Sequence, residues 1–147
     1  MKLKLLLILF SGVFLNACGK SATDLNSIQP AVSSKGSFTA VFFPGGGGID
    51  FVMLPAFESS GVDINNKPFK SLYYDFVGRK QGEVDKAIDN ILINQGYTKV
   101  EIAAPVGVDK YYLYQKAGVN MMAVWYSKEV KEGFKYITRT YFWWNQE

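Results

Sequence analysis

Apolar and polar residues alternate along the C-terminal half of the chain with the two-residue period of β-strands. The alternation runs through residues 97–103, 108–116, 121–127 and 134–144, with turn residues between the segments. These segments are rich in Tyr, Val, Thr and Trp, the residues that strands favour. Their short connections favour antiparallel neighbours, so the pattern predicts a four-stranded meander.

One segment before the meander has a helical period instead. From residue 82 to residue 95, apolar side chains recur three or four positions apart, which places them on one stripe of a helix. Glu83 and Asp85 lie in the first turn, where the helix dipole favours anions. Gly96 stands where a helix commonly ends.

Shorter segments with a β pattern precede this helix at residues 37–43, 49–54 and 71–77. Four glycines at 45–48 predict a hairpin loop, because the Lys that a phosphate-binding loop requires does not follow them. Residues 56–70 contain Gly, Asn-Asn and Pro and predict a long loop. The chain as a whole predicts an α+β fold: a single small domain with one amphipathic helix packed on a curved antiparallel β-sheet.

The N-terminus has a different character. Lys2 and Lys4 precede an apolar run at residues 5–15, and Leu15-Asn16-Ala17-Cys18 ends with the only cysteine of the chain. A run of about 11 residues fits the hydrophobic region of a signal peptide, whereas a membrane-spanning helix needs about 20. The layout resembles the signal peptide and lipobox of bacterial lipoproteins. The alternatives are a conventional signal peptide and an N-terminal anchor helix.

The resemblance implies that Cys18 receives a diacylglyceryl group and becomes the first residue after cleavage, with acyl chains such as palmitate as a membrane anchor. Gly19 stands where an Asp would favour the inner membrane, so the implied location is the periplasmic face of the outer membrane. The inner membrane and the cell surface are the alternatives. The expected organisation is a signal peptide at 1–17, the lipidated cysteine with a flexible tether at 18–36, and a globular domain at 37–147.

Composition excludes several classes of function. Without Lys2 and Lys4, basic residues outnumber acidic residues by one, and no basic stripe is present, which argues against nucleic-acid binding. The chain has no histidine, which excludes Ser-His-Asp and Cys-His catalysis and zinc sites built from Cys and His. We expect no metal and no cofactor. An enzyme would have to rely on carboxylates, for which the candidates are Asp50, Glu58, Asp63 and Asp75.

Aromatic residues concentrate between residues 111 and 144. Alternate residues of a strand face opposite sides, and a single helix covers only one side of a sheet. Aromatic residues are therefore expected on the open side, where Tyr and Trp favour binding. The candidate binding face is Tyr112, Tyr114, Tyr126, Tyr141 and Trp143. The alternative is that the aromatic residues fill a small core.

These patterns predict a non-enzymatic binding module for a protein partner in the cell envelope. Three alternatives are an immunity or inhibitor protein acting on a toxin or hydrolase, a module that binds peptidoglycan or another glycan, and a carboxylate-dependent enzyme acting on glycans. Residues 37–147 resemble no family that would decide among them.

Overall fold

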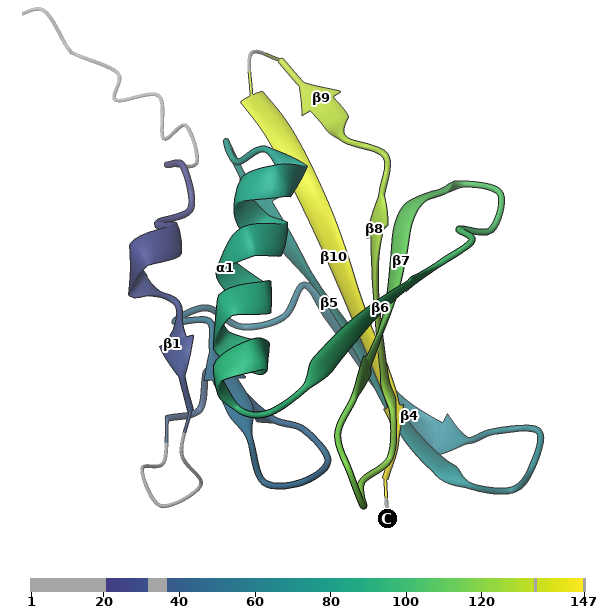
Figure 1. Cartoon of the computed structure of the whole chain (residues 1–147). Coiled ribbons are helices and arrows are strands. Elements are labelled where there is room, and N and C mark those ends of the chain that lie inside the picture. Colours follow the sequence, from purple (N-terminus) through teal and green to yellow (C-terminus); the bar gives the residue numbers. More distant parts are fainter. Residues whose placement is uncertain (1–20, 32–36, 134, 147) are drawn as a thin grey trace, which may run out of the picture.

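The structure is a computed structural model that describes residues 21–31, 37–133 and 135–146. It confirms the predicted α+β class: within these residues, one α-helix packs on antiparallel β-sheet in a single small domain (Figure 1). The predicted signal peptide at 1–17 and the predicted lipidation site at Cys18 lie outside the described residues.

The main sheet has the strand order β4-β5-β10-β8-β7-β6, and the short strand β9 pairs with the start of β10. Every pairing in it is antiparallel, and β6, β7, β8 and β10 form the predicted meander. Its strands are β4 (Phe57–Val62), β5 (Pro68–Val77), β6 (Thr98–Ile102), β7 (Val108–Gln115), β8 (Met122–Ser127), β9 (Val130–Glu132) and β10 (Lys135–Asn145).

The long loop predicted at 56–70 is wrong, because most of it forms the β4–β5 hairpin. Only the turn between the two strands is irregular. The Asp63 carboxylate accepts hydrogen bonds from the N–H groups of Asn65 and Lys67. Pro68 begins β5, a position where a strand tolerates a residue without an N–H. The residues that suggested a loop therefore form a compact turn and one strand end.

A second layer covers one face of the main sheet (Figure 1). It consists of α1 (Gln81–Asn94) and a small sheet of order β1-β3-β2, with strands β1 (Gln29–Pro30), β2 (Ala40–Phe42) and β3 (Gly48–Asp50). Residues next to the small sheet cover β5 and β10: Phe51 stacks on Tyr74 with ring centroids 4.0 Å apart, and Phe43 stacks on Phe142. The helix covers β7 and β8, and its residues Val84, Ile88 and Leu92 are completely buried.

Residues 21–31, which we call the N-terminal strap, pack against the domain, so the prediction of a flexible tether is wrong for them. The strap contains a 3₁₀ turn at Leu25–Ser27, and β1 pairs with β3. Ile28 and Ala31 are each only 8% exposed. The polar composition was misleading because backbone hydrogen bonds and two apolar side chains are enough to hold an extended segment at a sheet edge. Residues 18–20 and 32–36 of the predicted tether lie outside the described residues.

The glycines at 45–48 connect β2 to β3, which confirms the predicted hairpin. Gly45 and Gly46 have φ angles of 85° and 79°, which residues with a Cβ rarely adopt. The turn contacts the C-terminal end of α1, where the Gln95 side-chain amide donates to the Gly48 carbonyl oxygen at 2.7 Å and the Tyr97 hydroxyl donates to the Pro44 carbonyl.

We expect Gly48→Ala to destabilise the domain by about 2–3 kcal/mol. A Cβ at this position would lie 2.4 Å from the Val41 carbonyl oxygen, so β2 and β3 would have to separate. Gly82→Ala is the control, because its Cβ would meet nothing within 4 Å and alanine favours a helix by about 1 kcal/mol over glycine. Urea denaturation of both variants checks this, and equal shifts in the same direction would contradict it.

Candidate functional site

Strand register assigns each residue of the main sheet to one of two faces. One face lies under α1 and the small sheet; the other is covered by no part of the chain that the structure describes. Tyr141 and Trp143 lie on this open face. Tyr112, Tyr114 and Tyr126 lie on the covered face and are between 0% and 4% exposed. The predicted single binding face of five residues is therefore corrected: the structure separates them into two groups.

Five aromatic residues stand in register across five neighbouring strands of the open face. Phe57 pairs with Tyr73, Tyr73 with Tyr141, Tyr141 with Trp125, and Trp125 with Tyr111. Their ring centroids are 5.7, 5.1, 5.1 and 5.7 Å apart in that order. We call this row the aromatic ladder. It crosses the sheet from β4 to β7, and Ile102 of β6 extends it because Ile102 pairs with Tyr111.

Most rings of the aromatic ladder are stacked face to face. The planes of Tyr141 and Trp125 differ by 1°, those of Phe57 and Tyr73 by 17°, and those of Tyr111 and Trp125 by 21°. Only the Tyr73–Tyr141 contact is strongly tilted, at 50°. Each ring therefore covers part of the faces of its neighbours, and the open surface consists mainly of ring edges.

Apolar side chains border the aromatic ladder on one side. Trp143 lies two residues after Tyr141 on β10 and therefore faces the same side. It stacks on Phe69, with ring centroids 6.1 Å apart. Its neighbours in the same row are Ala123, then Leu113, then Val100 on β6. Val100 is 41% exposed. From Trp143 to Val100 this second row is apolar and adjoins the ladder, whereas on the other side of Trp143 it continues with Ser71 and Ser59.

An ion pair borders the aromatic ladder on the other side. Arg139 donates two hydrogen bonds to Asp75, at 2.6 and 2.8 Å, and its guanidinium lies 4.4 Å from the centre of the Tyr73 ring. The bonds to Asp75 raise the pKa of Arg139 above its usual value. Because the two charges neutralise each other, this edge adds no net charge to the open face. Beside Arg139 lies an open cavity of about 360 Å³, also lined by Ser127, Val130, Lys131 and Ile137.

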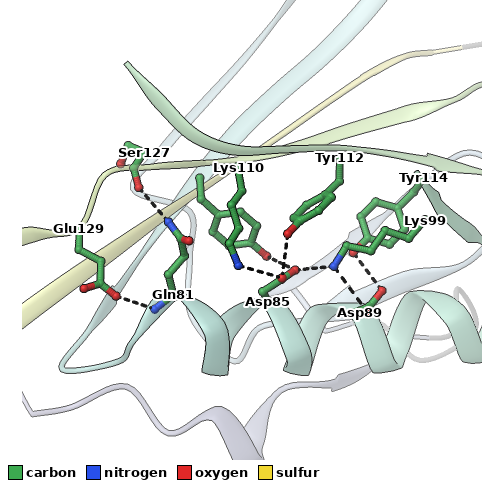
Figure 2. A network of polar contacts seen from close by, with 10 residues as sticks. Gln81, Asp85, Asp89, Lys99, Lys110, Tyr112, Tyr114, Ser127 and Glu129 are labelled. Carbon is green, nitrogen blue, oxygen red and sulfur yellow. Dashed lines mark hydrogen bonds and ion pairs between the residues drawn. The ribbon is translucent and has the colours of Figure 1, made fainter. Parts of the chain in front are cut away.

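Tyr112 and Tyr114 belong to a polar network between α1 and the sheet (Figure 2), and Tyr126 joins the same network through Asp85. The Asp85 carboxylate accepts from the Lys99 ammonium at 2.8 Å, the Tyr112 hydroxyl at 3.2 Å and the Tyr126 hydroxyl at 3.4 Å. The Tyr114 hydroxyl donates to Asp89 at 3.3 Å. Burial, followed by the nearby aspartate charges, raises the pKa of all three tyrosines.

This network fastens the helix to the sheet and offers little room to a ligand. The Asp85 side chain is only 13% exposed, and every group that faces it is already a hydrogen-bond or ion-pair donor. At the start of the helix, Glu129 accepts from the Gln81 N–H, and the Gln81 side chain donates to the Ser127 carbonyl oxygen (Figure 2). The buried tyrosines are thus structural anchors of α1.

The four candidate carboxylates are each engaged in a separate local interaction. Asp50 accepts from the Thr39 hydroxyl and the Val52 N–H, and these bonds, Thr39 first, lower its pKa. Asp63 holds the β4–β5 turn, and the Lys67 N–H is the main cause of its lowered pKa. Glu58 pairs with Lys70 at 2.7 Å, and Asp75 pairs with Arg139. Glu58 and Asp50 also share a neighbour, because both charges add to the burial that raises the pKa of the Tyr74 hydroxyl.

The described residues contain no group of three or more Cys, Asp or Glu side chains placed to hold a metal ion. Across the same part of the chain, no helix is both long and apolar enough to cross a membrane.

Sequence reasoning missed the residues that give the open face its order. Phe57 and Phe69 were assigned to a loop, so their strands were not available for pairing. Tyr73, Tyr111 and Trp125 lie in predicted strands. Their alternation against buried neighbours was visible, but the strand order that aligns them was not. Recognising residues 57–77 as a β-hairpin would have placed Phe57 and Phe69 in strands and allowed them to be paired with their neighbours.

Comparison with known proteins gives no match: no family model, no curated protein sequence and no solved structure resembles the chain significantly. The function is therefore argued from the site itself.

Proposed function

We propose that the chain is a non-enzymatic lipoprotein, anchored through Cys18 on the periplasmic face of the outer membrane, that binds a protein partner of the cell envelope. The partner binds to the open face of the main sheet. The observation that carries this proposal is the aromatic ladder, five rings in register on a surface that no described part of the chain covers.

The dimensions and chemistry of the open face suit a protein interface. Strands lie about 4.8 Å apart, so five rings extend over about 20 Å. Contiguous exposed apolar surface of this kind marks interaction sites, and Tyr and Trp are enriched among the residues that dominate binding energy. The neighbouring charges of Asp75 and Arg139 are paired with each other, so a partner needs no strong charge to match them.

The ring geometry favours a protein over a glycan. A sugar packs its C–H face flat against the exposed face of an aromatic ring. In the aromatic ladder, the planes of three neighbouring pairs lie within 21° of parallel, so each ring shields the face of the next. Ring edges and hydroxyl groups remain, and these suit the side chains of a second protein surface, because aromatic edges attract other ring faces and carbonyl groups.

We expect Tyr111→Asp to weaken partner binding by about 2 kcal/mol or more, a loss of at least about 30-fold in affinity. The change puts a carboxylate into the apolar row. Tyr111 lies at the outer end of the aromatic ladder, where its ring contacts Trp125. The measurement is capture of the tagged, lipidated chain from detergent-solubilised membranes, identification of a stoichiometric companion, and titration of the purified pair.

Ile93→Asp is the matched control, because Ile93 is 46% exposed on α1, away from the open face. It should keep the companion. Retention of the companion by Tyr111→Asp, or its loss with Ile93→Asp, would place the interface elsewhere. The absence of a companion, together with quenching of tryptophan fluorescence by soluble peptidoglycan fragments, would replace the proposal with glycan binding.

A further inference from the structure

The N-terminal strap determines which end of the domain lies nearest the lipid anchor. The Thr23 N–H donates to the Val77 carbonyl oxygen at 2.8 Å, and its hydroxyl accepts from the Val77 N–H at 3.0 Å. Arg79 also donates to the Thr23 carbonyl. Thr23 follows Cys18 by five positions, a length of chain that spans at most about 17 Å. If Cys18 is acylated as proposed above, this end of β5 stays within that distance of the bilayer.

The same end of the sheet carries an exposed apolar loop. Residues 103–107, with the sequence AAPVG, connect β6 to β7 and are all exposed. Val108, directly after the loop, pairs with Ser127, and the Ser127 carbonyl oxygen accepts from Gln81 in the first turn of α1. The loop therefore lies at the end of the domain where β5 ends and α1 begins (Figure 1).

This loop has the composition of a segment that enters the lipid interface. It contains no charged residue, and Val106 is fully exposed. Its N–H and C=O groups lie at a chain reversal that projects from the sheet, so it can enter the headgroup region without removing the sheet from water.

Cationic side chains surround the first turn of the helix at the same end. Lys80, Lys128 and Lys131 are exposed there. Three glutamates stand beside them in the sequence: Glu83 and Glu129 accept from the N–H groups of Lys80 and Gln81, and Glu132 follows Lys131. Exposed lysines are attracted to anionic headgroups, but the glutamates balance their charge, so the apolar loop is the main contact with lipid.

The opposite end of the domain exposes one apolar side chain within a polar turn. Ile64, in the β4–β5 turn, is fully exposed. It lies beyond the other end of β5, a strand of 10 residues that extends over about 33 Å. Exposed apolar side chains, Val106 and Ile64, thus stand at opposite ends of the sheet, and of these two Val106 is at the end to which the strap leads.

We infer that the 103–107 loop inserts Val106 into the interfacial region of a phospholipid bilayer beside the acyl anchor. This inference rests on the proposed lipidation of Cys18. The strands of the main sheet then point away from the membrane, and the open aromatic face is directed sideways, toward partners that are themselves at the membrane.

The test uses one introduced thiol in the acylated full-length protein, whose only native cysteine is blocked by lipid. Val106→Cys and the matched Ile64→Cys are labelled with an environment-sensitive fluorophore and reconstituted into vesicles of phosphatidylethanolamine and phosphatidylglycerol. We expect a blue-shifted emission at Val106→Cys, and quenching by spin-labelled lipid several-fold stronger there than at Ile64→Cys. Equal quenching at both positions, or stronger quenching at Ile64→Cys, would overturn the inference.

A second variant tests the strap itself. Ile28→Asp with Arg79→Ala removes a buried side chain and a hydrogen bond of the strap, and should lower the quenching at Val106→Cys. Unchanged quenching would show that the strap does not set the orientation. The mass of each purified protein is measured first. A chain without acyl groups refutes the proposed lipoprotein, whereas an acylated chain with the wrong quenching pattern refutes only the membrane-facing loop.

Discussion

Replacing Asp85 with Ala is expected to destabilise the domain by about 3–5 kcal/mol, because one partner of a buried charged network is removed while the others stay. Asp85 accepts from Lys99, Tyr112 and Tyr126, and the Lys110 ammonium lies 3.8 Å away. Without the carboxylate, two buried hydroxyl groups lose an acceptor, at about 1–3 kcal/mol each when unsatisfied. Chemical denaturation at neutral pH measures the loss.

Two control variants separate the network from a general effect of removing an acid. Asp109→Ala removes a carboxylate from an exposed position on β7 and should change stability by less than about 0.5 kcal/mol. Asp89→Ala should fall between the two, because Asp89 is 33% exposed and accepts from Tyr114 at 3.3 Å. If Asp85→Ala were no more harmful than Asp109→Ala, the network would not be what fastens α1 to the sheet.

The strongest periodic segments of the sequence predicted their elements well. The helix at 82–95 and the strands at 97–103, 108–116 and 121–127 each agree closely with α1, β6, β7 and β8. Local periodicity is enough in these cases because each segment carries a full apolar stripe or row of its own. The class of the fold follows from their order.

The side of the sheet that α1 covers could not be predicted, because both sides of the aromatic strands are apolar. Tyr111 and Tyr112 are adjacent, as are Trp143 and Trp144, and alternation shows only that such neighbours must separate. The choice is made by tertiary contact: Asp85 on α1 needs hydroxyl and ammonium donors, and Tyr112 is on the side that supplies them. The hydrophobicity of the strand residues alone therefore does not show which side of the sheet the helix covers.

Two of the segments that were predicted wrongly share a physical cause. β4 and the strap residues at 21–31 are polar and lie at sheet edges, with β4 exposed over most of its length. Segments of this kind are held by backbone hydrogen bonds to a neighbouring strand, which the chain supplies elsewhere in the sequence. A polar composition therefore did not distinguish an edge strand from a loop.

The domain is expected to unfold cooperatively in alkaline solution, between about pH 11 and 12. Burial raises the pKa of five tyrosines in the folded state, Tyr74, Tyr97, Tyr112, Tyr114 and Tyr126, while the unfolded chain titrates near pH 10. Above pH 10 the unfolded state therefore binds fewer protons than the folded state, so stability falls as pH rises; below pH 10 these groups add no pH dependence. Each contributes up to about 1.4 kcal/mol per pH unit, so five remove up to about 7 kcal/mol per unit from a total of about 5–15 kcal/mol.

Two Tyr→Phe variants test this account, because they act alike at high pH and oppositely at neutral pH. Both Tyr74→Phe and Tyr126→Phe should reduce the alkaline slope of stability by about one fifth. At pH 7, Tyr126→Phe should destabilise by about 1 kcal/mol, since its bond to Asp85 is lost. Tyr74→Phe should stabilise by a similar amount, because the Tyr74 hydroxyl is buried without a hydrogen-bond partner among the described residues. Urea titrations from pH 7 to 12 measure both quantities. A stability that stays constant above pH 10, or a slope that neither variant changes, would show that buried tyrosine hydroxyls do not control the alkaline limit of the fold.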